Sequence, residues 1–189
     1  MTIVGLGNPG DEYELTRHNV GRWALAAVAK RLGEPRFEAK PQLKARVARV
    51  AESGRSASLA SLGTGGDIFL VEPVIYMNES GQAVRAVLDY FKLPVDLLYV
   101  LHDDLDLGLG SYKIQFGIGP KIHNGLLSLY EALGTDQFWH VRLGVDGRNG
   151  DRSMPGQAYV LQKFSESEMP TVKQMIDASI DQLLKSTKP

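Results

Sequence analysis

The chain has 189 residues, 43% hydrophobic and 23% charged, a balance typical of a globular protein that buries a core, and its lack of cysteine excludes disulfide bonds, thiol catalysis and cysteine-based metal sites. The net charge of −1 excludes a protein that attracts nucleic acid by its overall charge, so such a partner would have to meet a local basic patch. No apolar run has the length of a membrane span and no leader precedes the first predicted strand, so we expect a cytoplasmic protein.

The first part of the chain alternates strand and helix patterns. Residues 2–7 are apolar and rich in β-branched side chains, which predicts a buried strand, and a helical pattern follows over residues 19–32. Residues 43–51 alternate apolar and charged side chains, which predicts a strand that pairs with residues 58–62. Residues 68–71 are wholly apolar, as in a strand that is covered on both faces of a sheet.

A second helix follows Gly81, because apolar side chains recur there every three or four positions. Asn78 or Ser80 can cap its first turn. An apolar strand over residues 97–101 then leads into the polar run 102–106. Strands that alternate with helices predict an α/β fold, in which functional groups gather at the carboxyl ends of the strands.

The last part of the chain adds an edge and a closing helix. Residues 111–116 alternate and predict an antiparallel edge strand, which a glycine-rich loop joins to a helix that ends at Leu133. Residues 138–145 predict another strand, and residues 158–161 a short one. The final helix is predicted to begin near residues 165–167.

The glycines of residues 5–10 have the G-x-G-x-x-G spacing of a dinucleotide-binding turn. Two features oppose that function. Pro9 removes a backbone donor that a pyrophosphate would need, and Lys30 lies about where a ribose-binding acid is expected. We therefore favour a tight turn that brings Asn8 and His18 together at a sheet edge.

His18 has the most informative neighbours of the four histidines. A neutral imidazole can take a proton from water, and it works best when a carboxylate holds its other ring nitrogen. Asp103 is the best candidate for that carboxylate, because it follows a predicted strand. The sequence thus predicts a hydrolase in which His18 is the general base.

Other chemistries have weaker support in the sequence. Asp104 and Asp106 form a D-x-D pair that can bind Mg²⁺, but two close acids alone are a weak indication of such a site. A serine hydrolase is disfavoured, because no G-x-S-x-G is present and a helix cap explains Ser80.

Three asparagines follow predicted strands or precede a predicted helix: Asn8, Asn78 and Asn124. Each carboxamide offers one acceptor and one donor group, so it can bind a peptide unit or donate to a developing oxyanion. We expect Asn8, Asn78 and Asp103 to converge at one end of the sheet.

Taken in order, five motifs resemble the bacterial peptidyl-tRNA hydrolase family. The match covers nearly the whole chain, and it is specific as a set, although no single motif is. The motifs are G-L-G-N-P-G over residues 5–10 with Tyr13, T-R-H-N-V-G over 16–21, Y-M-N-E-S-G over 76–81, H-D-D-L-D over 102–106 and H-N-G-L over 123–126.

The resemblance implies a single α/β domain over residues 1–189, with a twisted, mixed and mostly parallel sheet surrounded by helices. It implies a monomeric esterase without a cofactor or metal that cuts the bond between peptide and tRNA and so rescues stalled translation. His18 aligns with the catalytic base, Asp103 with its partner acid, and Asn8 with the residue that distinguishes blocked from free aminoacyl-tRNA. Tyr13, Tyr76, Asn78 and Asn124 align with substrate contacts.

The same resemblance implies contacts to tRNA phosphates. Lys113 and Arg142 align with residues of that role, and Lys121 lies in a neighbouring loop. The loop over residues 117–122 departs from the glycine-rich run of the family, and Gln115 replaces a basic residue. These departures leave a second hypothesis open, a non-catalytic RNA-binding protein on the same scaffold.

Overall fold

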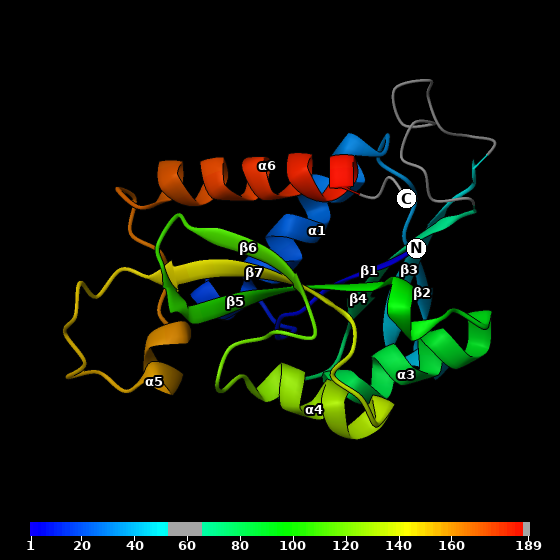
Figure 1. The fold of residues 1–189 in the computed structure, drawn as a ribbon, viewed down its shortest axis with the longest axis horizontal. Coiled ribbons are helices and arrows are strands. Elements are labelled where there is room, and N and C mark those ends of the chain that lie inside the picture. The colour runs from blue at the N-terminus through cyan, green and yellow to red at the C-terminus, as the bar shows by residue number, and fades with distance from the viewer. Residues whose placement is uncertain (53–65, 187–189) are drawn as a thin grey trace.

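The computed structural model describes residues 1–52 and 66–186, and these fold around a seven-stranded sheet in the order β2-β3-β4-β1-β5-β7-β6 (Figure 1). The strands are β1 Thr2–Gly5, β2 Glu38–Lys40, β3 Ala45–Val50, β4 Ile68–Pro73, β5 Leu98–Gly108, β6 Tyr112–Phe116 and β7 Trp139–Asp146. β1 pairs in parallel with β4 and β5, and β5 pairs in parallel with β7, whereas the β2–β3, β3–β4 and β6–β7 pairs are antiparallel. The predicted α/β class with a mixed sheet is confirmed, but three of the six strand pairs are antiparallel, so the sheet is not mostly parallel as expected.

Helices cover both faces of this sheet (Figure 1). α1 and α6 lie on one face and α3 and α4 on the other, and each pair encloses its own cluster of buried apolar side chains. The helices are α1 Val20–Arg31, α3 Ser80–Phe91, α4 Asn124–Leu133, α5 Gly156–Val160 and α6 Met169–Ser186, with 3₁₀ turns η1 Arg17–Asn19, η2 Pro41–Leu43, η4 Met77–Glu79 and η5 Val95–Leu97. Because β1 is central, Ile3 and Val4 are fully buried, one in each cluster.

The first turn of α1 lies directly on the sheet backbone. A Cβ atom at Gly21 would lie 2.3 Å from the carbonyl oxygen of Leu101 and 2.7 Å from that of Leu6. Only a residue without a side chain allows this approach. The turn that precedes α1 and carries His18 is therefore fixed against β1 and β5.

β5 is longer than the sequence predicts. The predicted strand ends at Leu101, but the observed one continues to Gly108, and β5 pairs with β7 as far as Asp104 and again at Gly108. Asp103 and Asp104 are buried, which the turn-like composition of this segment does not indicate. Both carboxylates have cationic or N–H partners in the fold, and these partners allow acidic residues to continue a central strand.

The prediction of a strand over residues 158–161 is wrong. These residues belong to the single-turn helix α5 and the residue after it, where the N–H groups of Ala158 and Tyr159 both donate to the carbonyl oxygen of Pro155. A short apolar run does not distinguish a strand from a buried helical turn.

One further prediction lies outside the described residues, and another needs correction. β3 pairs with β4 and with β2, and its expected partner over residues 58–62 lies outside the described residues. Neither Asn78 nor Ser80 caps α3, because Glu79 occupies the cap position without a side-chain hydrogen bond. Asn78 is exposed instead, which leaves its carboxamide available.

Among the described residues, no helix combines the length and the apolar character that crossing a membrane requires.

Candidate active site

A cavity of about 820 Å³ opens near the carboxyl ends of the parallel strands. It brings together segments from the start, the middle and the end of the described chain. Eight of the ten predicted site residues line it, namely Asn8, Tyr13, His18, Tyr76, Asn78, Asp103, Lys121 and Asn124. The expected convergence of Asn8, Asn78 and Asp103 is thus observed.

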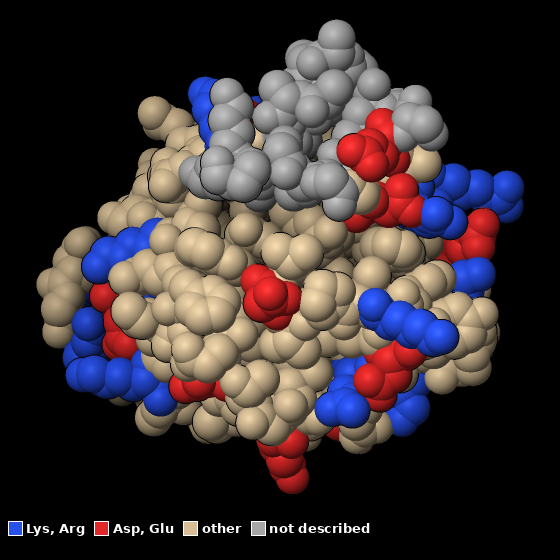
Figure 2. All heavy atoms as spheres, turned by 45° about the vertical axis from the view of Figure 1, so that its right-hand side comes forward, with Lys and Arg blue, Asp and Glu red and all other residues tan. Residues whose placement is uncertain are grey.

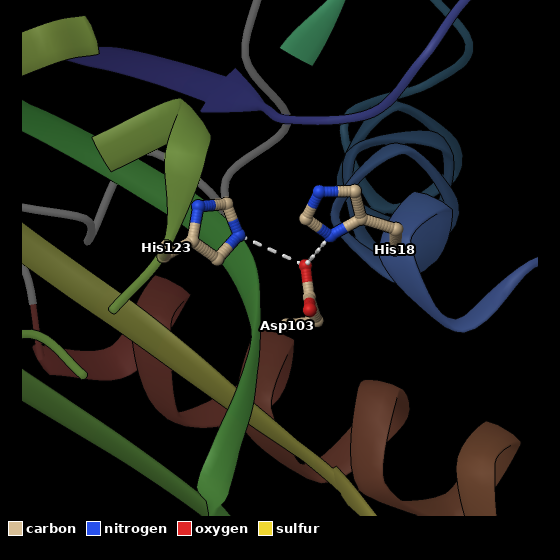
Figure 3. A group of neighbouring side chains, drawn as sticks. All are labelled: His18, Asp103 and His123. Carbon is tan, nitrogen blue, oxygen red and sulfur yellow. Dashed lines mark hydrogen bonds and ion pairs between the residues drawn. The ribbon is translucent and has the colours of Figure 1, made fainter. Parts of the chain in front are cut away.

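His18 and Asp103 are in direct contact. His18 lies in η1, where it is 7% exposed, and Asp103 lies in β5, where it is 2% exposed. The Nδ1 atom of His18 lies 2.8 Å from Oδ1 of Asp103 (Figure 3). A carboxylate only accepts, so Nδ1 carries the proton and Nε2 keeps a lone pair. His18 therefore has the tautomer that a general base needs.

His123 binds the same carboxylate oxygen from the other side (Figure 3). It is the cap residue of α4, where its Nδ1 accepts from the backbone N–H of Leu126 at 3.2 Å. Its Nε2 must then carry the proton, which it donates to Oδ1 of Asp103 at 2.9 Å. The sequence places His123 in a motif but does not predict this contact. A histidine just before a helix is the only signal of it in the sequence.

The two imidazoles determine the charge of this cluster. Burial raises the pKa of Asp103, but the adjacent His18 and His123 outweigh it and hold that pKa far below its usual value. Burial also lowers the pKa of His18, but the charge and hydrogen bond of Asp103 outweigh that effect, so the pKa of His18 lies above 6.5. In this cluster Asp103 is therefore a stable carboxylate, and the adjacent His18 is a stronger base than an ordinary imidazole.

His18, Asp103 and His123 also have the composition of a metal site, with one ligand atom from each lying within 4.8 Å of the others. The hydrogen bond from Leu126 opposes this use. A metal at Nε2 of His123 would need a lone pair there, which would place the proton on Nδ1, facing the Leu126 N–H donor. The tautomer that these hydrogen bonds require fits proton transfer better than metal binding.

The Asp104–Asp106 pair does not form a free cation site. Oδ2 of Asp104 accepts from Nε of Arg142 at 2.7 Å, and its Oδ1 accepts from the backbone N–H of Asp106 at 2.7 Å. The Asp104 carboxylate is therefore already neutralised by a guanidinium group, which makes the Mg²⁺ hypothesis weaker than the sequence alone leaves it.

The side chain of Asn8 has a fixed orientation. Its Oδ1 accepts from the backbone N–H of Met77 at 2.8 Å. The Asn19 carboxamide pairs with the backbone of Asn8 through contacts of 2.8 and 3.0 Å. Because Oδ1 is occupied, Nδ2 is the group that Asn8 offers to the cavity. The sequence does not predict the role of Asn19 in this orientation.

The remaining polar lining is more exposed. Asn78 lies in η4 and Asn124 is the first residue of α4, and both residues are exposed. The rings of Tyr13 and Tyr76 meet edge to face with centroids 6.5 Å apart. These four residues form an open polar and aromatic side of the cavity.

Another part of the cavity wall is apolar. It includes Leu105 from β5, Val160 and Leu161 from α5 and the residue after it, and Ile122 from the β6–α4 loop. Ile122 is 76% exposed, so it stands at the mouth of the cavity rather than in the core.

The three predicted phosphate contacts have different environments. Lys113 is exposed on β6, and Lys121 is exposed in the cavity wall, where its backbone N–H donates to Asp106. Arg142 is only 7% exposed, and its guanidinium group is engaged by Asp104 and by Oε1 of Gln115 at 2.9 Å. Lys113 and Lys121 are thus accessible to a ligand, whereas Arg142 is buried.

The other two histidines lie deeper. His102 and His140 are fully buried and meet edge to face at 5.5 Å, and His102 also packs against His123. Burial lowers the pKa of both rings, that of His140 to about 4, so both are neutral near pH 7. They support the cluster from behind and do not face the cavity.

Comparison with known proteins agrees with this geometry. The family model for peptidyl-tRNA hydrolase matches residues 2–188. A peptidyl-tRNA hydrolase of Solidesulfovibrio magneticus is 40% identical over 182 residues, which are 96% of this chain and 84% of the relative. One from Bacillus cereus strain Q1 is 36% identical over 184 residues, with 95% and 88% covered.

Solved structures give the same result. The structure of a peptidyl-tRNA hydrolase complex with N-propanol superposes with a TM-score of 0.82 at 30% identity, covering 98% of this chain and 88% of that one. The enzyme of Acinetobacter baumannii gives 0.76 at 30% identity, with 99% and 86% covered. Sequence motifs, fold and relatives therefore agree that the chain belongs to the peptidyl-tRNA hydrolase family.

Proposed function

We propose that this protein hydrolyses the ester bond between peptide and tRNA in peptidyl-tRNA, with His18 as the general base, and so returns tRNA to translation. The observation that carries the proposal is the 2.8 Å contact between His18 and Asp103 in a cavity lined with carboxamides. A non-catalytic RNA-binding protein would have no need of a base in this tautomer, so the geometry favours the enzyme.

The chemical step follows from the protonation states. Nε2 of His18 takes a proton from a water molecule as the water oxygen attacks the ester carbonyl carbon. Asp103 stabilises the imidazolium that results. When the tetrahedral intermediate collapses, the bond to the ribose oxygen breaks, and that oxygen takes the proton from Nε2. The products are a peptide carboxylic acid and a free tRNA hydroxyl.

Carboxamides supply the donors that this step needs. The exposed Asn78 and Asn124 can donate to the oxyanion, and one such donor is typically worth about 3 kcal/mol. Nδ2 of Asn8 can donate to the acyl carbonyl oxygen of the peptide. A free aminoacyl ester lacks that carbonyl and carries an ammonium group instead, so Nδ2 of Asn8 would face a second donor and reject it.

The RNA half of the substrate needs local cations. On the face shown in Figure 2, many Lys and Arg side chains lie next to Asp and Glu side chains, and an acidic side chain stands near the centre among uncharged residues. We assign phosphate contacts to Lys113 and Lys121, which are exposed. Arg142 then acts indirectly, because its guanidinium group holds the side chains of Asp104 and Gln115 in place.

We further propose that residues 1–189 act as one domain and as a monomer in the cytoplasm, where translation takes place. The catalytic contact between His18 and Asp103 is formed within one chain, and this supports the monomer. Light scattering during size-exclusion chromatography tests this, and a mass of two chains would contradict it.

The purified protein should release tRNA from N-acetyl-aminoacyl-tRNA in the presence of EDTA, because proton abstraction depends on His18 and not on a metal. His18→Ala should slow the reaction about 10²–10⁴-fold. Loss of the labelled acyl group from precipitated tRNA measures the rate. Wild-type protein that binds tRNA but leaves the ester intact would favour the RNA-binding alternative.

The pH profile should report the pKa of His18. Because the base must be neutral and its pKa is raised, kcat/KM should increase with pH through a value above 6.5 and then level off. In Asp103→Asn the amide oxygen can still accept from both rings, but its charge is gone. Burial, which lowers the pKa of His18, then dominates. The acid limb of the kcat/KM profile should therefore move to lower pH, while its plateau falls about a hundredfold or more. An unchanged limb and plateau would remove Asp103 from the mechanism.

Asn8→Asp should weaken the discrimination between substrates. The new carboxylate can still accept from Met77, but it cannot donate to the acyl carbonyl, and it can pair with an ammonium group. The ratio of kcat/KM for N-acetylated over free aminoacyl-tRNA should therefore fall about tenfold or more. Asn149→Asp, an equal change of charge on an exposed loop, is the control. A ratio that stays at the wild-type value would show that Asn8 is not the discriminating residue.

Lys113→Ala and Lys121→Ala should each reduce the salt dependence of kcat/KM on full-length tRNA. Each lost phosphate contact should lower the slope of log(kcat/KM) against log[salt] by about 0.7–0.9. A minimal ester that carries only the terminal nucleoside should be hydrolysed at the wild-type rate. Equal losses on both substrates would argue against a phosphate role.

A further inference from the structure

Arg17, the neighbour of the catalytic base, is itself buried. Both of its terminal nitrogen atoms have hydrogen-bond partners, whereas its Nε has none among the described residues. It is 5% exposed, and its Nη2 donates to both carboxylate oxygens of Glu168, at 2.9 and 2.8 Å. Its guanidinium carbon lies 4.4 Å from the ring centroid of Tyr159 and 4.6 Å from that of Phe164. None of these contacts is part of the chemistry described above.

These contacts join the turn that carries His18 to the end of the sheet and the last two helices. Nη1 of Arg17 donates to the carbonyl oxygen of Val145 at the end of β7, at 3.3 Å. Tyr159 lies in α5, and Glu168 directly precedes α6. The backbone agrees, because the N–H of Arg17 donates to the carbonyl oxygen of Gln162 at 3.0 Å.

One side of the same junction borders the cavity. α5 and the residue after it supply Val160 and Leu161 to the apolar wall, whereas His18 stands on the polar wall. Arg17 contacts Tyr159 of α5 through its side chain and Gln162 through its backbone, and it directly precedes His18 in η1. The Arg17 side chain is therefore one of the links between the turn that carries His18 and the α5 segment of the cavity wall.

Arginine is suited to this junction in a way that lysine is not. Its planar group can stack on aromatic rings while it makes directed hydrogen bonds to a carboxylate and to a carbonyl. Burial raises the pKa of Glu168, but hydrogen bonds from Ser165 and Arg17 outweigh it and keep that carboxyl group ionised. A lysine would keep the charge and lose the planar contacts.

We propose that Arg17 is a positioning residue for hydrolysis, which through Glu168 and Tyr159 holds His18 in line with Asp103 and at a fixed distance from the α5 wall. The proposal rests on the function proposed above. It predicts that replacing Arg17 changes the position of the His18 ring, although His18, Asp103 and the carboxamides of the cavity all remain present.

Arg17→Lys is the test, with Arg31→Lys as the matched control. Arg31 also bridges α1 to α6, through Asp177 and Asp181, but from the far end of α1 and on the surface. With N-acetyl-aminoacyl-tRNA, Arg17→Lys should lower kcat about tenfold to a hundredfold, as misplacement of a base by a fraction of an ångström does, whereas Arg31→Lys should stay within twofold. Circular dichroism below the unfolding temperature shows that both variants are folded.

A second measurement needs no substrate. The ring ¹⁵N resonances of His18, assigned with His18→Ala, report its titration. In Arg17→Lys the pKa of His18 should move from its raised value toward 6.5, because the contact with Asp103 loosens, and in Arg31→Lys it should not move. This readout stands even if the wild type hydrolyses no ester, so failure of the proposed function and failure of the positioning role are distinguishable.

The outcomes are decisive in both directions. A folded Arg17→Lys protein with wild-type kcat and wild-type His18 titration overturns the proposal. If Arg17→Lys does not fold, Glu168→Gln takes its place, since it keeps Arg17, its ring contacts and its bond to Val145. Lowered kcat with a shifted titration in Glu168→Gln supports the proposal, and unchanged values of both overturn it.

Discussion

The site depends on one buried carboxylate between two imidazole rings. Asp103 lies in a central strand, where an unpaired charge would be costly, and His18 and His123 each donate a hydrogen bond to its Oδ1. These two donors keep the carboxylate ionised, and the carboxylate in turn sets the tautomer of His18. The same interaction therefore satisfies a buried charge and prepares a base.

Three different features of the fold bring these groups together. A glycine at position 21 lets the start of α1 lie against the backbone of β1 and β5, which brings η1 and His18 to the carboxyl ends of the strands. An extension of β5 carries Asp103 beyond the predicted end of the strand. The cap of α4 uses Nδ1 of His123 and so directs Nε2 toward Asp103. Each of these three features belongs to the packing or hydrogen bonding of the backbone, and each also orients a reactive side chain.

Local patterns in the sequence are sufficient for much of this arrangement. The strand at residues 2–7, the first helix and the convergence of Asn8, Asn78 and Asp103 follow from periodicity and from the rules for α/β sheets. The ordered motifs by themselves indicate the family, and the relatives confirm it.

The features that the sequence does not reveal depend on contacts between distant residues. No local pattern shows that His123 reaches Asp103, that Met77 fixes the carboxamide of Asn8, or that Asp104 is held by Arg142. The acidic run 102–106 has turn-like composition, and only its tertiary partners make part of it a strand. The helix α5 resembles a strand in sequence because five residues are too few to show a period.

The contact between Arg17 and Glu168 joins residues 151 positions apart, so it closes almost the entire length of the polypeptide. During synthesis His18 and Asp103 leave the ribosome long before Glu168 does, and domains complete their packing only when such distant segments are available. A nascent chain that already carries both reactive residues therefore lacks the guanidinium–carboxylate link behind them. Under the positioning role proposed for Arg17, the order of synthesis delays the mature arrangement of the site until Glu168 has emerged.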